Sequence, residues 1–129
     1  SFVGENMGDD SGYSVSSAGD VDGDGLDDIL IGAPHYDQSG GYDSAGKSYV
    51  LLGSTISSNP SGTSFDLSNA DYSFVGEKYG DDSGYSVSSA GDVDGDGLDD
   101  ILIGAPENDD SGSGIGKSYV ILGSTIGGI

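Results

Sequence analysis

Residues 20–34 read DVDGDGLDDILIGAP, and the same fifteen residues recur at 92–106. In each copy the first nine residues carry five carboxylates and two glycines, and an apolar run follows at once. Carboxylates packed this densely repel one another unless a cation lies among them. Acids at the first, third and fifth positions offer hard oxygen ligands, which makes Ca²⁺ the first candidate.

Two near-identical copies of one unit make up most of the chain. Positions 1–34 match 73–106 at 32 of 34 residues, and 47–56 match 117–126 with one difference. Identity this high indicates recent duplication or deliberate engineering. The predicted division is a first repeat at 1–56, a linker at 57–72 and a second repeat at 73–129.

Each unit is predicted to hold four short β-strands. In the first copy these are residues 1–5, 13–18, 29–33 and 47–53. The third strand is apolar throughout, so both of its faces should be buried, and Pro34 ends it. The small residues of the second strand suit a position near the narrow central axis around which sheets stack radially. Four strands per unit, one of them buried on both faces, predict an all-β fold of two β-propeller blades.

The string GDVDGDGLDDILIGAP, at residues 19–34 and 91–106, resembles the FG-GAP repeat. This repeat builds the β-propeller of integrin α-subunits and occurs in many bacterial secreted proteins. The resemblance covers nearly the whole chain apart from the linker. One departure is visible, because the Phe-Gly of the family name is replaced here by Ser11-Gly12 and Ser83-Gly84.

The resemblance implies blades of four antiparallel strands, with one Ca²⁺ per repeat in the hairpin loop between the first two strands. The implied ligands of the first copy are Asp20, Asp22, Asp24, the backbone carbonyl of Leu26, and Asp28. Those of the second copy are Asp92, Asp94, Asp96, the Leu98 carbonyl and Asp100. Asp27 and Asp99 fall out of phase with these ligands, so we expect their side chains to face solvent.

Other interpretations of the loop fit less well. An EF-hand needs a bidentate acid at the twelfth position and flanking helices, whereas that position is Ile31, inside an apolar strand. A nonapeptide β-roll has a period of about nine residues, far shorter than the repeat here. Mg²⁺ prefers to keep its waters and uses few carboxylates. A solvated acidic turn without metal remains the simplest alternative.

Charge excludes several classes of partner. The chain has a net charge of −20, and only three of its residues are Lys or Arg. Nucleic acid and anionic membrane surfaces both require basic residues, so neither is an expected partner. No apolar run approaches the ~20 residues of a membrane span, so membrane insertion is not expected. Cysteine is absent, so disulfides are excluded.

Nothing in the sequence indicates an enzyme. The single histidine, His35, is replaced by Glu107 in the second copy. There is no nucleophile elbow, no cysteine nucleophile, and no Ser/His/Asp set that both copies share. The adjacent acids Asp9 and Asp10 are poor candidates for a glycosidase pair, which needs two carboxyl groups facing each other across a cleft.

Two blades do not close a propeller, which needs roughly 4–8. Either the chain is part of a longer propeller, or three or four copies form a homo-oligomeric ring of six or eight blades. In such a ring, residues 1–5 could supply the outer strand to the last blade of a neighbouring chain.

The function predicted from these observations is a Ca²⁺-binding propeller module. The resemblance implies a secreted or extracellular location and an adhesion or ligand-binding role, with a protein or glycan ligand. Two alternatives stay open. The chain could be a blade pair from a secreted enzyme whose catalytic domain lies elsewhere, or an engineered fragment that self-assembles.

Overall fold

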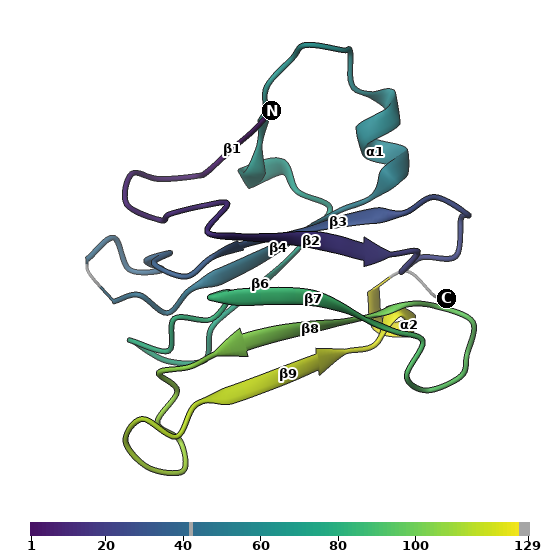
Figure 1. The fold of residues 1–129 in the computed structure, drawn as a ribbon. Coiled ribbons are helices and arrows are strands. Elements are labelled where there is room, and N and C mark those ends of the chain that lie inside the picture. The colour runs from purple at the N-terminus through teal and green to yellow at the C-terminus, as the bar shows by residue number, and fades with distance from the viewer. Residues whose placement is uncertain (42, 127–129) are drawn as a thin grey trace.

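Two antiparallel β-sheets dominate this computed structural model, which describes residues 1–41 and 43–126 (Figure 1). The first sheet has the strand order β2-β3-β4-β6, and the second has the order β7-β8-β9. The first comprises β2 (Ser14–Gly19), β3 (Asp28–Ala33), β4 (Lys47–Leu51) and β6 (Tyr72–Val75). The second comprises β7 (Ser86–Gly91), β8 (Asp100–Ala105) and β9 (Lys117–Ile121). The predicted all-β class is confirmed. Four strands were expected in both sheets, but the second has three among the described residues.

The acidic stretch joins two adjacent strands, as predicted. In the β2–β3 hairpin, Val15 lies opposite Ile31, and the register shifts between Ser17 and Gly19 just before the loop begins. The β7–β8 hairpin repeats this register. The shift ends the regular ladder at the glycine that precedes the first acid, so the following residues form the connection between the strands.

Strand β3 is buried on both faces, as its apolar sequence predicts. Its counterpart β8 has the same six residues but a different environment. Leu30 in β3 is fully buried, whereas the matching Leu102 in β8 is 36% exposed. The difference arises because Leu30 packs between the two sheets, while Leu102 lies on the outer face of the second sheet.

The two sheets pack face to face around a shared core. Leu30 and Val50 of the first sheet contact a cluster that includes Ile101 and Ile103 of the second. Strands β2 and β7 lie side by side (Figure 1). Burial of each large aliphatic side chain contributes about 1.5–3 kcal/mol. Sheets that stack while their first strands converge are the arrangement expected of neighbouring propeller blades.

The segment between the repeats, predicted as a linker, is folded. The helix α1 (Gly53–Ser58) crosses its start, and β5 (Phe65–Asp66) and the short 3₁₀ helix η1 (Leu67–Asn69) lie within it. Leu67 is buried against Ile31, Tyr49 and Leu51 of the first sheet. The segment therefore connects the repeats and also covers the face of the first sheet that points away from the second (Figure 1).

The N-terminal residues form the predicted strand, but with an unpredicted partner. Strand β1 (Phe2–Val3) pairs in parallel with β5, Phe2 opposite Phe65. Its counterpart in the second repeat lies in β6, the outer strand of the first sheet, where Val75 pairs with Lys47. Donation of residues 1–5 to a neighbouring chain therefore stays a prediction.

The chain ends, within its described part, on a second short helix. This helix, α2 (Gly123–Ile126), places Ile126 in the core between the two sheets. No helix among the described residues combines the length and apolarity that crossing a membrane requires.

Candidate metal centre

The two acidic loops share one geometry, organised around their first acid. The Asp20 carboxylate accepts hydrogen bonds from the backbone N–H groups of Gly23, Asp24 and Gly25 at 2.7, 3.1 and 2.9 Å. Asp92 makes the same three bonds in the second loop. Gly23 and Gly25 have φ of +81° and +89°, a left-handed backbone that glycine adopts without steric cost. The glycines thus let each loop curl around its first carboxylate.

Three predicted ligands come together in each loop. Carboxylate oxygens of Asp20, Asp22 and Asp28 lie within 4.8 Å of one another in the first loop. In the second loop the corresponding group is Asp92, Asp94 and Asp96. Between them the two groups include the first, third, fifth and ninth loop positions. The remaining predicted ligands, Asp24, Asp100 and the Leu26 and Leu98 carbonyls, lie outside these groups and stay predictions.

Asp28 is the most buried of the loop acids, with 1% of its surface exposed. Its two carboxylate oxygens accept the backbone N–H groups of Val21 and Gly53, both at 2.8 Å. Burial raises the pKa of Asp28, and these two bonds oppose the rise. Asp100 makes the matching pair of bonds in the second repeat. This acid therefore ties the loop, the following strand and the start of a helix together.

The acid at the third loop position has an unfavourable environment for a lone negative charge. Burial raises the pKa of Asp22, and the charges of Asp24 and Asp20 raise it further. Burial and the charge of Asp96 act in the same direction on the pKa of Asp94. A divalent cation among these oxygens would remove the repulsion and offset the cost of burial. Clustered carboxylates with no nitrogen or sulfur donor fit a hard cation.

Comparison with known families agrees with the repeat seen in the sequence. A family model described as the FG-GAP repeat matches residues 11–51 and 83–121, more than half of the chain. The chain belongs to the FG-GAP repeat family. Both matched ranges contain a complete acidic loop and the strands on either side of it.

Curated relatives of this FG-GAP chain include integrin α-subunits. Integrin alpha-PS2 of Drosophila melanogaster is 36% identical over 130 residues, which cover 98% of this chain and 9% of that protein. Integrin alpha-5 of Xenopus laevis is 41% identical over 109 residues, which cover 81% of this chain and 9% of that protein. The chain thus spans about a tenth of the length of these relatives.

Asp99 does not face solvent, contrary to expectation. Its carboxylate accepts the backbone N–H of Asp20 at 2.9 Å, and its own N–H donates to the Asp20 carbonyl at 3.0 Å. The acidic loops of the two FG-GAP repeats are therefore joined directly. Asp27, at the same loop position in the first repeat, is exposed as predicted. The local sequence of the two loops is identical, so no local signal could have separated these two acids.

Replacement of Asp99 by alanine is expected to lower the free energy of unfolding by about 1.5–3 kcal/mol, because the backbone N–H of Asp20 in the other loop loses an ionised acceptor. The matched variant Asp27→Ala should stay within about 0.5 kcal/mol of the parent chain, since Asp27 is exposed. Urea unfolding of both variants measures the difference. Equal losses would show that the contact between the loops adds no stability.

The one histidine is paired with an acid at the surface. The Nδ1 atom of His35 lies 2.9 Å from a carboxylate oxygen of Asp10, and both side chains are exposed. Glu107 occupies the matching position of the second FG-GAP repeat. The pair is therefore a feature of one repeat and has no counterpart in the other.

Proposed function

We propose that this chain is a Ca²⁺-binding β-propeller module in which each acidic loop holds one ion. The observation that carries the proposal is the convergence of three carboxylates within 4.8 Å in each of two identical hairpin loops. The first ion is held by Asp20, Asp22, Asp24, Asp28 and the Leu26 carbonyl. The second is held by Asp92, Asp94, Asp96, Asp100 and the Leu98 carbonyl.

The role of the ion in this proposal is structural. Ca²⁺ supplies positive charge where five acids occupy nine residues. Asp28 already connects its loop to β3 and to α1 through two backbone bonds. An ion that neutralises this acid stabilises the hairpin and the helix together, so metal binding contributes to folding.

We further propose an adhesion or ligand-binding role outside the cell, where Ca²⁺ is abundant enough for weak sites to be occupied. The integrin α-subunits among the relatives support this role. Variable loops usually carry the binding surfaces of repeat proteins. Here a depression of about 1170 Å³ lies beside the first variable loop, where Glu5, His35 and Tyr36 line it. A protein or glycan ligand fits this surface better than nucleic acid, given the net charge of −20.

Native mass spectrometry in Ca²⁺ tests the metal proposal, with two bound ions expected per chain. Asp20→Ala and Asp92→Ala should each retain one ion, because each removes the acid around which its loop curls. Asp27→Asn changes an acid of the same loop that is not a proposed ligand, so it should retain both. Two ions in the Asp20 variant, or one in the Asp27 variant, would contradict the ligand assignment.

The sheet edges favour a second proposal, assembly of several chains into a closed propeller. In the first sheet the outer strand β6 pairs with β4, Phe74 opposite Ser48. In the second sheet β9 has no such partner among the described residues. Residues 1–3 repeat the sequence of 73–75, so once β1 leaves its pairing with β5, the same register would place Phe2 of a neighbouring chain opposite Ser118. Three or four chains would then complete six or eight blades.

A further inference from the structure

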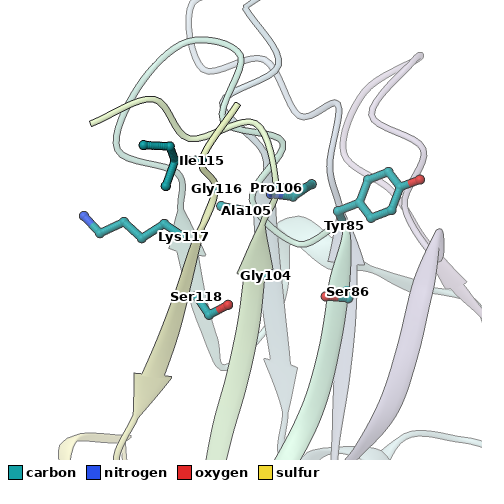
Figure 2. Close-up of a pocket in the computed structure, with 9 residues that line it drawn as sticks. All are labelled: Tyr85, Ser86, Gly104, Ala105, Pro106, Ile115, Gly116, Lys117 and Ser118. Atoms are coloured by element: carbon teal, nitrogen blue, oxygen red, sulfur yellow. The ribbon is translucent and has the colours of Figure 1, made fainter. Parts of the chain in front are cut away.

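An open pocket lies on the outer face of the second sheet, at the ends of β7, β8 and β9 (Figure 2). Its volume is about 420 Å³. Figure 2 shows Ser86 and Ser118 on either side of Gly104, with their hydroxyl oxygens pointing toward one another. The floor of the pocket is therefore bare backbone at Gly104, flanked by two small polar side chains.

The same position in the first sheet is already filled. There the turn at residues 82–84 of the second repeat packs against Gly32 and Gly46, and a β-carbon at either glycine would overlap the backbone of Gly84 or Ser83. The Ser14 hydroxyl donates to the Gly84 carbonyl at 2.8 Å. Ser83 stands where the family name has Phe, and it is 4% exposed in this position. The turn at residues 82–84 therefore fills, in the first sheet, the position that is an open pocket in the second sheet.

The first repeat carries a turn of the same sequence at residues 10–12, and nothing in the described part of the chain packs on it in this way. Asp10 and Asp82 have φ of 53° and 51°, and Gly12 and Gly84 both have φ of 90°. In both turns the glycine N–H donates at 3.0 Å to a glycine carbonyl of the neighbouring strand. In the part of the chain that the structure describes, no atom outside the turn lies within 4 Å of a β-carbon position at Gly12. The free turn has the sequence and the backbone shape of the docked one.

We propose that the pocket of the second sheet is a docking site for the turn at residues 10–12 of a second copy of this chain. The proposal rests on the assembly proposed above, and it specifies the contact. The occupant is a second copy because the pocket and the free turn are the two halves of an interface that the chain already forms internally. Ser86 then donates to the Gly12 carbonyl of the second copy, as Ser14 does to Gly84.

A second contact near the acidic loops supports the same head-to-tail direction. Gly19 lies against the Asp99 carboxylate, which accepts the N–H of Asp20. Among the described residues, nothing lies within 4 Å of the β-carbon position of its counterpart Gly91. The exposed Asp27 of a second copy would reach Gly91 as Asp99 reaches Gly19. Docking of one second copy would therefore form a contact at each end of β7, one at the pocket and one at Gly91.

Two replacements should make the pocket of the second sheet bind the turn more weakly than the same position of the first sheet does. Ile115 replaces Ala45 at its rim, and Glu107 replaces His35. Within the chain, His35 pairs with Asp10 and also lies near Asp82: burial raises the pKa of Asp82, and the neighbouring His35 opposes that rise. In the docked pair, Asp10 of the second copy keeps its own His35 and takes the place of Asp82, so it meets Glu107 where Asp82 meets His35. Repulsion between these acids falls with added salt, so association should strengthen as ionic strength rises.

Sedimentation velocity of the whole chain in Ca²⁺, over a range of concentrations, tests the docking site. Gly104→Ala is expected to weaken association by about 100-fold, because the new methyl group occupies the place of the incoming backbone. Within the single chain this methyl overlaps only the Ser86 hydroxyl, which can rotate away, and makes ordinary contacts with the rest of Ser86. Ser118→Trp provides a second variant, since Ser118 is exposed and lines the same pocket.

The matched substitution in the first repeat separates docking from folding. Gly32→Ala should lower the melting temperature of the dilute chain, whereas Gly104→Ala should leave it unchanged. Association of Gly104→Ala and Ser118→Trp at the level of the parent chain would overturn the docking site and leave assembly standing. A parent chain that stays single at its highest soluble concentration would overturn both. Two Ca²⁺ per chain in native mass spectrometry would uphold the metal proposal in either case.

Discussion

Transfer of the chain from excess Ca²⁺ into a chelator is expected to lower its melting temperature by about 15 °C. A ligand at about 100 times its dissociation constant stabilises the folded state by about 2.7 kcal/mol per site. Two sites give about 5 kcal/mol, and each kcal/mol shifts the melting temperature of a domain of this size by about 3 °C. Ion removal also exposes the mutual repulsion of three converging carboxylates in each loop.

Circular dichroism with and without chelator measures this shift. NaCl at matched ionic strength serves as the control, because screening alone weakens repulsion among the acids without filling a site. Asp20→Ala should lose about half of the Ca²⁺-dependent shift, since one of the two loops no longer binds. Equal melting temperatures with and without Ca²⁺ would refute a structural role for the ion.

The sequence was sufficient to locate the candidate site and the strands around it. The change from five acids in nine residues to an unbroken apolar run places a loop directly before a buried strand, and the structure has that hairpin twice. Burial of β3 on both faces follows from the same run. These features depend on residues close together in the chain, so a local pattern can predict them.

The structure of the segment between the repeats could not be predicted from a local sequence pattern. Residues 53–58 are Gly, Ser, Thr and Ile, which are weak helix formers, yet they make α1. The helix depends on contacts from outside the segment, since Asp28 accepts the N–H of Gly53 and Ile56 packs on the core around Leu67. Tertiary contacts therefore decide the structure of this segment.

Identical repeats expose a further limit of sequence reasoning. Asp27 and Asp99 share the same neighbours in sequence, as do Leu30 and Leu102, but one member of each pair contacts the other repeat and the other does not. Position along the stack of sheets decides which member is buried. A local pattern assigns both members the same environment, and this is why Asp99 was predicted to face solvent.

This dependence on position leads to a large expected difference between two otherwise identical substitutions. Leu30→Ala should lower the free energy of unfolding by about 3 kcal/mol or more, because it leaves a cavity between the sheets. Leu102→Ala should cost about 1 kcal/mol or less, since its side chain is 36% exposed on the outer face. Urea unfolding of the dilute chain measures both, and with a slope of about 2 kcal/mol per molar the Leu30 variant should unfold at about 1.5 M less urea.

The concentration dependence of the Leu102 variant adds a second test within the same experiment. If a second copy covers the outer face of the second sheet, the cost of Leu102→Ala should rise with protein concentration, because Leu102 then becomes buried as Leu30 is. The cost of Leu30→Ala should stay constant, since Leu30 is already fully buried within one chain. Equal costs for the two variants in the dilute chain would contradict the packing of the sheets. A cost at Leu102 that does not change with concentration would place this residue outside any contact between copies.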